Sequence, residues 1–289
     1  MDFRQIRYFL EIHRQGSFLR AAGNLGLTQP ALSQQMALLE RELGKKLFWR
    51  GPTGAHISSD GERFLGHALE LEHVLREISE SMKTTPGLQG SYTIATGGTI
   101  AAFVLPKAMR RILRGHPDVS LRVVEGDAFQ TAESVRSGQA DLGVLSGSFP
   151  EGDIQRRFFF TDQILPVISN AHPFARKRRV SLKSLEEVQF LMYHPAAAMR
   201  QSVEHQIRSL GAAFRPRIVM ELRSIESVVK GVEEGLGVGF LSRLAVSRKM
   251  KVIPVPELVA SRDFYFCYRR ISQGIETLMH ILQENQALK

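Results

Sequence analysis

The stretch SFLRAAGNLGLTQPALSQQ, residues 17–35, decides the fold of the N-terminal part of the chain. Ser17 and Thr28 each stand before a helical run and can cap a helix, and Gly26 supplies the turn between the runs. Leu32 anchors the second helix. Two helices joined by a short turn that contains glycine are typical of a helix-turn-helix, whose second helix fits the major groove of DNA. These residues therefore predict a DNA-reading unit.

The second helix has a polar outer face. Leu32, Met36 and Leu39 recur at helical spacing and predict its buried side. The positions that then face outward are Gln29, Pro30, Ser33, Gln34 and Ala37. In a major groove, residues near the start of such a helix reach the edges of the bases. Each residue alone would be an ordinary solvated position, and only the whole motif makes them candidates for DNA contact.

Short elements flank this motif on both sides. A preceding helix, ended by Gly16, is expected from the helical spacing of Phe3, Ile6, Leu10 and His13. A tight loop, and with it a two-stranded wing, is expected from Gly51, Pro52 and Gly54. We therefore expect a winged helix-turn-helix over residues 1–58.

A long linker helix is expected over residues 59–89, beginning at Ser59 and Glu62, which have the spacing of a capping box. Apolar residues follow at alternating intervals of four and three, which is the heptad pattern of a coiled-coil seam: Phe64, Ala68, Leu71, Leu75, Ile78 and Met82. The same spacing would suit a helix packed on its own domain. The uninterrupted length and the charged flanks favour a dimerisation seam.

From residue 90 to residue 289 the pattern alternates between strand and helix. Strands are expected at 92–96, 121–124, 142–145, 164–168, 190–193, 218–221, 238–241 and 264–268. Helices are expected at 100–113, 132–136, 199–210, 225–234 and 271–282. Repeated βα units predict an α/β fold with mainly parallel, doubly wound sheets. We expect two lobes with a cleft between them, lobe 1 from residues 90–161 and 267–289 and lobe 2 from residues 162–266.

One loop of this region has the composition of a ligand site. Thr96-Gly97-Gly98-Thr99 joins the first strand to the helix that follows. A glycine pair before a helix lets the backbone approach a ligand, and the free N–H groups there attract anions. The two threonines add hydroxyl groups. On spacing alone, an ordinary capped turn between strand and helix is the favoured interpretation.

Composition excludes several classes of protein. The single Cys267 rules out an internal disulfide and a cysteine-cluster metal site. Arg4 and Arg7 interrupt the first apolar positions, so no secretory signal is expected, and no stretch approaches the ~20 apolar residues of a membrane helix. We therefore expect a soluble cytoplasmic protein without metal or cofactor.

The net charge of +9 suits a nucleic-acid partner, but its distribution does not make that case. Most of the excess lies in residues 161–289, outside the expected DNA-reading unit. The run Arg176-Lys177-Arg178-Arg179 is interpreted as a solvated loop.

Residues 17–35 closely resemble the LysR-type transcriptional regulators. The resemblance continues in order at Leu38-Leu39-Glu40, Glu42-Leu43-Gly44, 47–50, 58–61, Leu105-Pro106, 137–142 and 235–239. It implies a winged helix-turn-helix, a dimerising linker helix and a sensor domain like a type 2 periplasmic binding protein. It also implies homodimers that pair into homotetramers, with RNA polymerase as a further partner.

The resemblance assigns roles to individual residues. The DNA-binding positions are Ser17, Thr28, Gln29, Pro30, Ser33 and Gln34, with Arg50 of the wing at the minor groove. Gln34 and Thr53 depart from the family pattern, because many members carry a basic residue at each position. A dimer carries two DNA readers, so the expected target is an interrupted inverted repeat in double-stranded DNA. Amide side chains favour adenine, so its half-sites are expected to be A·T-leaning.

The resemblance also places the effector site in the cleft. The residues it implies are Thr96, Gly97, Gly98, Thr99, Asp127, Ser146, His194 and Pro195. The effector is expected to be a small molecule, such as a small organic acid. Asp127 is awkward for an anion, because like charges repel in a cleft. A ligand that carries both charges, or an Asp127 that points outward, would reconcile the two.

A cytoplasmic two-lobed enzyme and a solute-binding protein are the alternatives. The sequence has no Gly-x-Ser-x-Gly elbow, no His-Glu-x-x-His motif and no phosphate-binding lysine loop. Gly235, Gly237 and Gly239 do not fit the dinucleotide spacing. A solute-binding protein would need export, for which no signal is found. A regulator that is not an enzyme is therefore the favoured interpretation.

Overall fold

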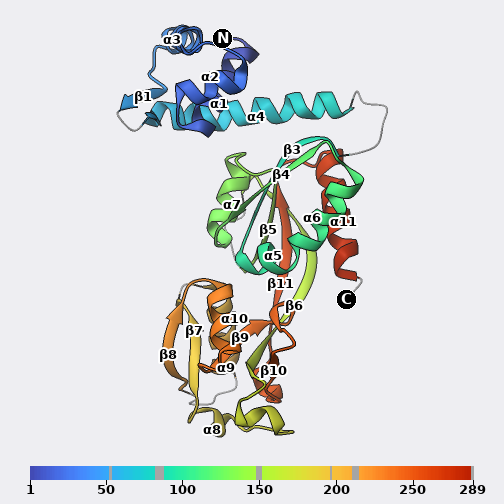
Figure 1. Ribbon diagram of the computed structural model, residues 1–289. Coiled ribbons are helices and arrows are strands. Elements are labelled where there is room, and N and C mark those ends of the chain that lie inside the picture. Colours follow the sequence, from blue (N-terminus) through green and yellow to red (C-terminus); the bar gives the residue numbers. More distant parts are fainter. Residues whose placement is uncertain (52–53, 82–87, 148–151, 196, 210–214, 288–289) are drawn as a thin grey trace. The chain divides into compact units, whose positions relative to one another are not determined.

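The structure, a computed structural model, describes residues 1–51, 54–81, 88–147, 152–195, 197–209 and 215–287 (Figure 1). The chain divides into two compact units. The first, here called the DNA unit, is built on Met1–Pro86. The second, the sensor unit, is built on Gly87–Arg136 and Ala140–Lys289. Each is described by itself.

The DNA unit has six elements in the order that the sequence predicts. They are α1 (Phe3–Gln15), α2 (Phe18–Leu25), α3 (Gln29–Leu43), β1 (Phe48–Gly51), β2 (Gly54–Ile57) and α4 (Ser59–Ser81). The predicted caps are confirmed, because Ser17 Oγ accepts a hydrogen bond from Arg20 N and Thr28 Oγ1 accepts one from Ala31 N. Gly26 ends α2 with φ +66°, a conformation that glycine adopts without strain.

The core of the DNA unit lies between α1, α3, the wing and the start of α4. Phe9 is fully buried, and its ring packs against those of Phe48 and Phe64 at 5.1 and 4.9 Å between centroids. The expected face of α1 was partly wrong, because Phe3 is 56% exposed. His13 is also exposed, and Phe9 and Ile12 occupy the buried side instead. Ile6 and Leu10 are buried, as predicted.

The wing is held close to the helix-turn-helix by backbone contacts. β1 and β2 form a two-stranded antiparallel sheet. Ala55 N donates a hydrogen bond to Gly16 O at 2.9 Å, across the turn between α1 and α2. Gly54 has φ +125°, and a Cβ built there would lie 2.4 Å from Gly16 O. Only glycine therefore lets the wing approach this turn so closely.

The cap of α4 differs from the prediction by one residue. Ser58 Oγ, rather than Ser59, accepts a hydrogen bond from a helix N–H, that of Gly61 at 2.9 Å. The N–H of Glu62 is taken by the carbonyl of Ser58. Ser58 is buried and also donates to the carbonyl of Lys46, which fixes the start of α4 against the segment just before β1. This tertiary contact decides between two adjacent serines that are equivalent on spacing.

The predicted seam on α4 separates into two parts. Ala68 is fully buried in the core of the DNA unit, and Phe64 packs against that core. Ala68 therefore has no surface left for a partner helix, which corrects its assignment to a dimer seam. Leu71 and Ile78 are 36% and 53% exposed, and Leu75 is half-buried. Met82 lies outside the described residues. Dimerisation through Leu71, Leu75 and Ile78 stays a prediction.

The sensor unit is an α/β fold of two lobes, as predicted. The first lobe contains β3 (Gly90–Thr96), α5 (Gly98–Phe103), α6 (Leu105–Gly115), β4 (Val119–Glu125), α7 (Ala128–Arg136), β5 (Leu142–Ser146) and α11 (Gln273–Ala287). The second contains η1 (Pro173–Arg176), α8 (Leu182–Leu185), β7 (Gln189–Tyr193), α9 (Ala198–Ser209), β8 (Arg217–Leu222), α10 (Ile225–Glu233), β9 (Val238–Ser242), η2 (Arg243–Ala245), β10 (Met250–Val252) and η3 (Pro256–Leu258).

Two long strands run through both lobes: β6 (Gln155–Ser169) and β11 (Ala260–Tyr268). They pair with each other in the middle of the sheet order β4-β3-β5-β11-β6-β9-β7-β8 (Figure 1). The outer pairs are parallel, but β11 with β5, β11 with β6 and β6 with β9 are antiparallel. The expectation of mainly parallel sheets was therefore too simple, and the expected boundary at residues 161–162 falls inside β6.

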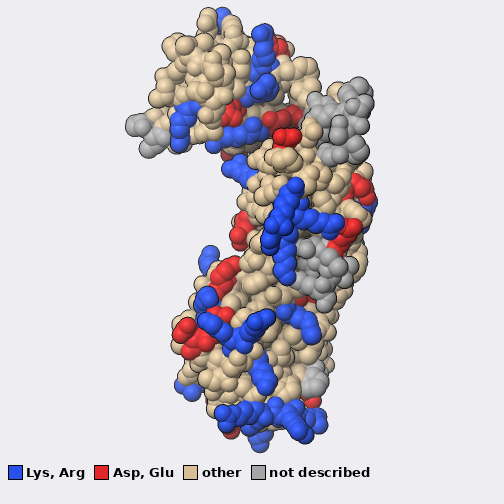
Figure 2. All heavy atoms as spheres, turned by 45° about the vertical axis from the view of Figure 1, so that its right-hand side comes forward, with Lys and Arg blue, Asp and Glu red and all other residues tan. Residues whose placement is uncertain are grey.

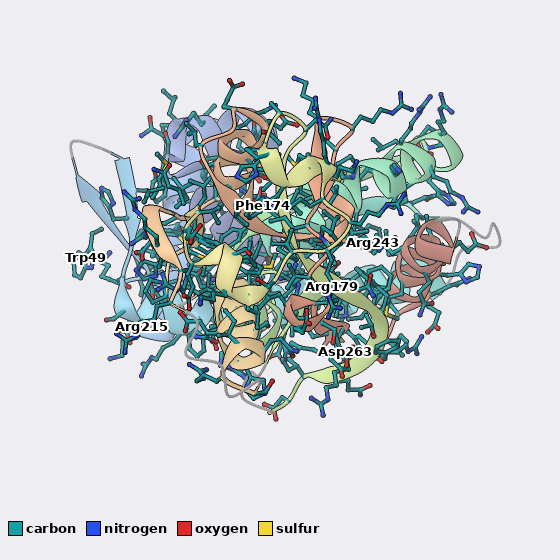
Figure 3. All side chains as sticks on the ribbon, turned by 90° about the horizontal axis from the view of Figure 1, so that it is seen from below. Trp49, Phe174, Arg179, Arg215, Arg243 and Asp263 are labelled. Carbon is teal, nitrogen blue, oxygen red and sulfur yellow. The ribbon has the colours of Figure 1, made fainter. Side chains whose placement is uncertain are left out.

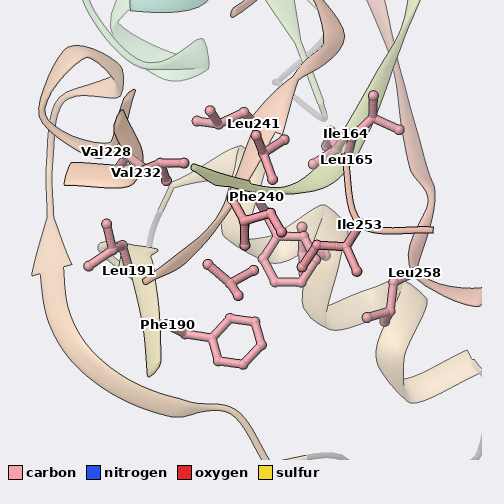
Figure 4. Close-up of a cluster of buried hydrophobic side chains, with 14 of the residues drawn as sticks. Ile164, Leu165, Phe190, Leu191, Val228, Val232, Phe240, Leu241, Ile253 and Leu258 are labelled. Carbon is pink, nitrogen blue, oxygen red and sulfur yellow. The ribbon is translucent and has the colours of Figure 1, made fainter. Parts of the chain in front are cut away.

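Each lobe has its own apolar core. In the second lobe, the rings of Phe190 and Phe240 stack at 6.0 Å between β7 and β9, surrounded by aliphatic side chains (Figure 4). Gly239 is required there, because a Cβ on it would lie 2.6 Å from Val232 of α10. Close packing of helix on strand explains this glycine of the 235–239 motif.

Among the described residues, no helix is both long and apolar enough to cross a membrane.

Candidate functional site

The first candidate site is the exposed start of α3. Gln29, Pro30 and Gln34 are exposed, and Ser33 is half-buried. Leu32, Met36 and Leu39 are buried at 0, 2 and 0% exposure, so the helix turns its polar face outward as predicted. Ser17 and Thr28 use their hydroxyl groups as caps within the unit. Each hydroxyl accepts a backbone hydrogen bond and keeps its own O–H as a donor, so their role at DNA stays a prediction.

The end of α3 is tied to the wing by a buried carboxylate. Glu40 Oε1 accepts hydrogen bonds from the backbone N–H groups of Leu47 and Phe48, at 2.9 and 3.3 Å. Its other oxygen pairs with Lys46 at 2.7 Å. These contacts hold the start of the wing at a fixed position relative to α3.

The wing carries an exposed residue, Trp49, that the sequence analysis did not name as a candidate for DNA contact. Arg50 lies on β1, but its side chain and the whole of Thr53 lie outside the described residues. Trp49, beside Arg50, is 60% exposed and projects from the DNA unit (Figure 3). Adjacent residues of a strand face opposite sides, so one of Phe48 and Trp49 had to face outward, but only the structure shows that it is Trp49.

The second candidate site is a cavity of about 420 Å³ between the lobes of the sensor unit, here called the inter-lobe pocket. Three helices of nine or more residues begin at its wall: α7 from the first lobe, and α9 and α10 from the second. The loop Gly97–Thr99 forms another part of the wall. Gly98 has no side chain, which allows Ile225 of the other lobe to approach to 3.4 Å from where a Cβ would be. N–H groups at helix starts can bind an anionic group.

Arg262 is the principal buried charge at the pocket. Its side chain, on β11, is 10% exposed and pairs with Asp162 of β6 at 3.1 Å. Its Nη2 also donates to Thr99 Oγ1 at 3.0 Å, while Ser242 donates to the other oxygen of Asp162 at 2.8 Å. Burial lowers the pKa of Arg262, and the nearby Asp162 carboxylate opposes that change. The hydrogen bonds of Arg262 to Asp162 and Thr99 are made by its Nε and Nη2.

Two residues of the pocket lining have buried hydroxyl oxygens without partners among the described residues. The hydroxyl oxygens of Tyr193 on β7 and Thr131 on α7 are buried and have no hydrogen-bond partner in the described part of the chain. Tyr193 is 5% exposed and Thr131 is 1% exposed. Burial raises the pKa of Tyr193, so its hydroxyl stays protonated at neutral pH.

Five of the eight predicted effector residues line the pocket: Gly97, Gly98, Thr99, Asp127 and Ser146. Thr96 does not, because it is fully buried and donates its hydroxyl to Val144 O at 2.7 Å. His194 and Pro195 also lie outside the lining. The chain turns away after Tyr193, where His194 N bonds to Leu222 O, so the residue before the predicted pair reaches the pocket.

The carboxylate of Asp127 has a local partner. Its Oδ1 accepts a hydrogen bond from Gln130 N at 2.8 Å, which caps α7. This bond explains an acidic residue at the wall of a pocket that otherwise favours anions, because the carboxylate compensates the start of its own helix.

The basic run at residues 176–179 is exposed, as the interpretation of a solvated loop requires. Lys177 lies 4.4 Å over the ring of Phe174, and Arg179 approaches Glu257 to 3.7 Å. The side chains of Phe174 and Arg179 are labelled in Figure 3. Figure 2 shows Lys and Arg spread over the sensor unit with acidic side chains among them.

The fold and these sites define a class: a winged helix-turn-helix joined to a two-lobed sensor. Comparison with known proteins supports the same class. Residues 3–62 match the family model for the bacterial regulatory helix-turn-helix protein of the lysR family, and residues 86–287 match the LysR substrate binding domain. The chain belongs to the LysR family and is a DNA-binding transcriptional regulator with an effector-binding domain.

Individual relatives extend over nearly the whole chain. A protein of Trichormus variabilis named "Probable RuBisCO transcriptional regulator" is 28% identical over 275 residues, which cover 91% of this chain and 81% of that protein. A full-length OxyR variant from Pseudomonas aeruginosa has a TM-score of 0.77 at 22% identity, covering 100% of this chain and 95% of that one. CbnR in complex with its target DNA has a TM-score of 0.68 at 17% identity, covering 98% and 99%. These structures share the fold.

Proposed function

We propose that this regulator binds double-stranded DNA as a homodimer that pairs into a homotetramer, at an interrupted inverted repeat with A·T-leaning half-sites. The exposed amides of Gln29 and Gln34 support adenine contacts, because an amide pairs bidentately with N6 and N7 of adenine. The exposed apolar positions Leu71 and Ile78 support pairing of α4 with a second copy. Two readers held in a dimer address two half-sites at a fixed spacing.

The DNA proposal is tested by selection from random duplexes. Full-length protein is incubated with a random duplex pool, and bound duplexes are enriched and sequenced. The expected result is an inverted repeat with an unselected spacer and A·T pairs in the half-sites. Selection of a single unpaired motif would contradict the dimeric mode, and G·C-rich half-sites would contradict the roles of Gln29 and Gln34.

The inter-lobe pocket is proposed to bind the effector, a small organic acid. One observation carries this proposal: the wall of a single cavity of about 420 Å³ combines the starts of α9 and α10 with the guanidinium-bearing Arg262. Such a cavity can enclose a small ligand and orient its anionic group. Because the ligand would touch both lobes, its binding favours one arrangement of the lobes over others, and a regulator can use that difference.

The ligand proposal is tested with a pocket-filling variant. Ala197 lines the pocket, so Ala197→Trp should fill it. Leu113 is 50% exposed on α6, and Leu113→Trp adds the same side chain away from the pocket. A panel of small carboxylic acids is screened against both full-length variants by thermal shift. Stabilisation of wild type and Leu113→Trp, but not of Ala197→Trp, is expected. Equal stabilisation of all three would place the ligand elsewhere.

The remaining parts of the proposal concern where the protein acts, its contact with RNA polymerase and the absence of catalysis. We propose a cytoplasmic regulator that contacts RNA polymerase and catalyses no reaction. A reconstituted transcription assay on the selected site, with and without an acid that shifts the melting temperature, measures this directly. A ligand-dependent change in transcript level is expected. Conversion of the acid to a product during the incubation would contradict the absence of catalysis.

A further inference from the structure

Three elements of the DNA unit meet at Leu47, where the chain enters the wing. On one side, Glu40 Oε1 of α3 accepts hydrogen bonds from the N–H groups of Leu47 and Phe48, at 2.9 and 3.3 Å. On the other side, Leu47 O accepts a hydrogen bond at 2.9 Å from the N–H of Ser58, just before α4. A Cβ on Gly61 of α4 would lie 2.2 Å from the same oxygen, so glycine is needed for this approach. The start of the wing is therefore held by α3 and α4 together.

A carboxylate at the position of Glu40 does more than fill space. Glu40 is 9% exposed, and an apolar side chain of similar volume often replaces a buried charge without loss of stability. The ion pair with Lys46 contributes little, because the lysine side chain is 63% exposed. What an apolar residue cannot supply is an acceptor for two consecutive N–H groups. These two directed bonds fix both the position and the direction of β1 where it begins.

The wing depends on such attachments for its orientation. β1 and β2 have four residues each, and a two-stranded sheet of this kind is at best marginally stable alone. β2 is attached to the turn after α1 through the bond from Ala55 N to Gly16 O. β1 is attached through Glu40 to α3, the helix that carries Gln29 and Gln34. The attachment makes the wing and α3 one rigid reader.

We infer that Glu40 is a positioning residue for DNA recognition, which aims the wing at the minor groove beside the major groove that α3 enters. The inference rests on the proposed function, in which the DNA unit binds half-sites of double-stranded DNA. Glu40 acts through the backbone of Leu47 and Phe48 rather than on a base. It therefore controls recognition of the flank that the wing reads, and leaves recognition of the base pair that Gln29 reads unchanged.

Two substitutions of equal charge separate the hydrogen bonds of Glu40 from its charge. Glu40→Gln keeps an oxygen that accepts from both N–H groups, whereas Glu40→Leu has a similar size and no acceptor. Both remove one negative charge, so the general attraction to DNA changes equally. A difference between the two variants in DNA binding therefore reports the hydrogen bonds. Glu42→Gln removes the same charge at an exposed position of the same helix and is the matched control.

The position of the wing is measured first on the free full-length protein. Trp49, the single tryptophan, follows Phe48 on β1 and is 60% exposed. Time-resolved fluorescence anisotropy is expected to show an added fast motion of Trp49 in Glu40→Leu, and wild-type behaviour in Glu40→Gln and Glu42→Gln. Circular dichroism verifies that each variant is folded. Glu40→Asp keeps the charge but shortens the reach by one methylene, so it should behave like Glu40→Leu and replaces that variant where it does not fold.

The DNA measurement uses the duplex enriched from the random pool and two altered forms of it. One form replaces the A·T pairs at the outer flank of each half-site by G·C, and the other changes the pair at which Gln29→Ala loses discrimination. Wild type, Glu40→Gln and Glu42→Gln are expected to bind the flank-altered duplex about fivefold more weakly than the original. Glu40→Leu is expected to bind the original more weakly and to ignore the flank. It should still reject the change at the Gln29 pair as strongly as wild type.

Four results would overturn the inference while DNA binding itself stands. Wild type may bind the original and the flank-altered duplex equally, which would mean that the wing reads no flank. Glu40→Leu and Glu40→Asp may keep the wild-type flank preference, which would mean that Glu40 does not aim the wing. Equal loss of discrimination at the flank and at the Gln29 pair would make Glu40 merely structural. Loss of the flank preference in Glu40→Gln would assign the effect to charge. A wild-type protein that enriches no duplex would instead refute the proposed function, before any variant is compared.

Discussion

At the scale of single residues, the ion pair between Arg262 and Asp162 organises the sensor unit. The two side chains are 10% and 1% exposed, and they join β11 to β6 where these strands pass between the lobes. Asp162 also accepts from Ser242, and Arg262 also donates to Thr99. Because both charges are desolvated, removal of one leaves the other buried without compensation.

We expect Asp162→Ala to destabilise the sensor unit by about 3–5 kcal/mol, because it leaves the Arg262 charge unpaired. The double variant with Asp162→Leu and Arg262→Met should be much closer to wild type. Urea unfolding followed by circular dichroism measures the loss, and fluorescence of the single tryptophan, Trp49, reports the DNA unit separately. A double variant less stable than Asp162→Ala would argue against this account.

Gln29 and Gln34 are expected to act differently on DNA. Gln34→Arg should strengthen binding to any duplex and steepen its salt dependence by up to about one unit of slope, through one new phosphate contact. Gln29→Ala should lose about 1–3 kcal/mol of discrimination at one base pair with little change in slope. Titrations of operator and scrambled duplexes at several salt concentrations measure both. Equal weakening on the two duplexes would make Gln29 a backbone contact.

At the scale of secondary-structure elements, α4 shows how a tertiary contact chooses between local alternatives. Ser58 caps the helix and donates to Lys46 O, whereas Ser59 is exposed. We expect Ser58→Ala to destabilise the DNA unit by about 0.5–2 kcal/mol. Ser59→Ala, the matched control, should change little. Urea unfolding followed by Trp49 fluorescence compares them, and equal losses would restore the capping box predicted from the sequence.

The exposed part of α4 is expected to carry dimerisation. Leu71→Glu with Leu75→Glu should dissociate the dimer and abolish specific DNA binding, because two readers must be held at a fixed spacing. Ser59→Glu with His67→Glu adds the same charge at exposed positions of the same helix and should leave the dimer intact. Light scattering after gel filtration measures the mass. A double leucine variant that stays dimeric would place the interface elsewhere.

At the scale of the whole molecule, the DNA unit has one apolar core, and the sensor unit has separate cores in its lobes that are joined by the shared strands β6 and β11. Cys267 lies in β11 and is fully buried. A Cβ on Gly143 of β5 would lie 2.2 Å from its sulfur, so the packing around the thiol is tight. Burial raises the pKa of Cys267 to about 12. The thiolate, which is the reactive form, is therefore scarce at neutral pH.

Cys267 is expected to report opening of the whole sensor unit. In native buffer at neutral pH, iodoacetamide should not label it, and in urea it should be labelled stoichiometrically. A ligand bound to the inter-lobe pocket should slow labelling at intermediate urea, because it stabilises the folded state. Mass spectrometry follows the reaction, with Cys267→Val as the unlabelled background. Rapid stoichiometric labelling of the native protein would contradict the burial of this residue.

The sequence by itself determined the elements of the DNA unit and the alternation of strands and helices after it, although it predicted one helix where α5 and α6 lie and missed β10. Helical spacing of Leu32, Met36 and Leu39, with caps at Ser17 and Thr28, identifies α2 and α3. These signals are local, because caps and periodicity depend on residues within a few positions of each other. The glycine loop at 97–99 was found for the same reason.

Only the tertiary structure decided how distant residues share one site. Thr131, Tyr193 and Arg262 reach the inter-lobe pocket from α7, β7 and β11, and no local pattern links them. Their meeting depends on β6 and β11 crossing between the lobes with antiparallel pairing, which strand propensity does not specify. The same limit applies to Ala68, since heptad spacing shows which residues share a helix face but not what covers that face.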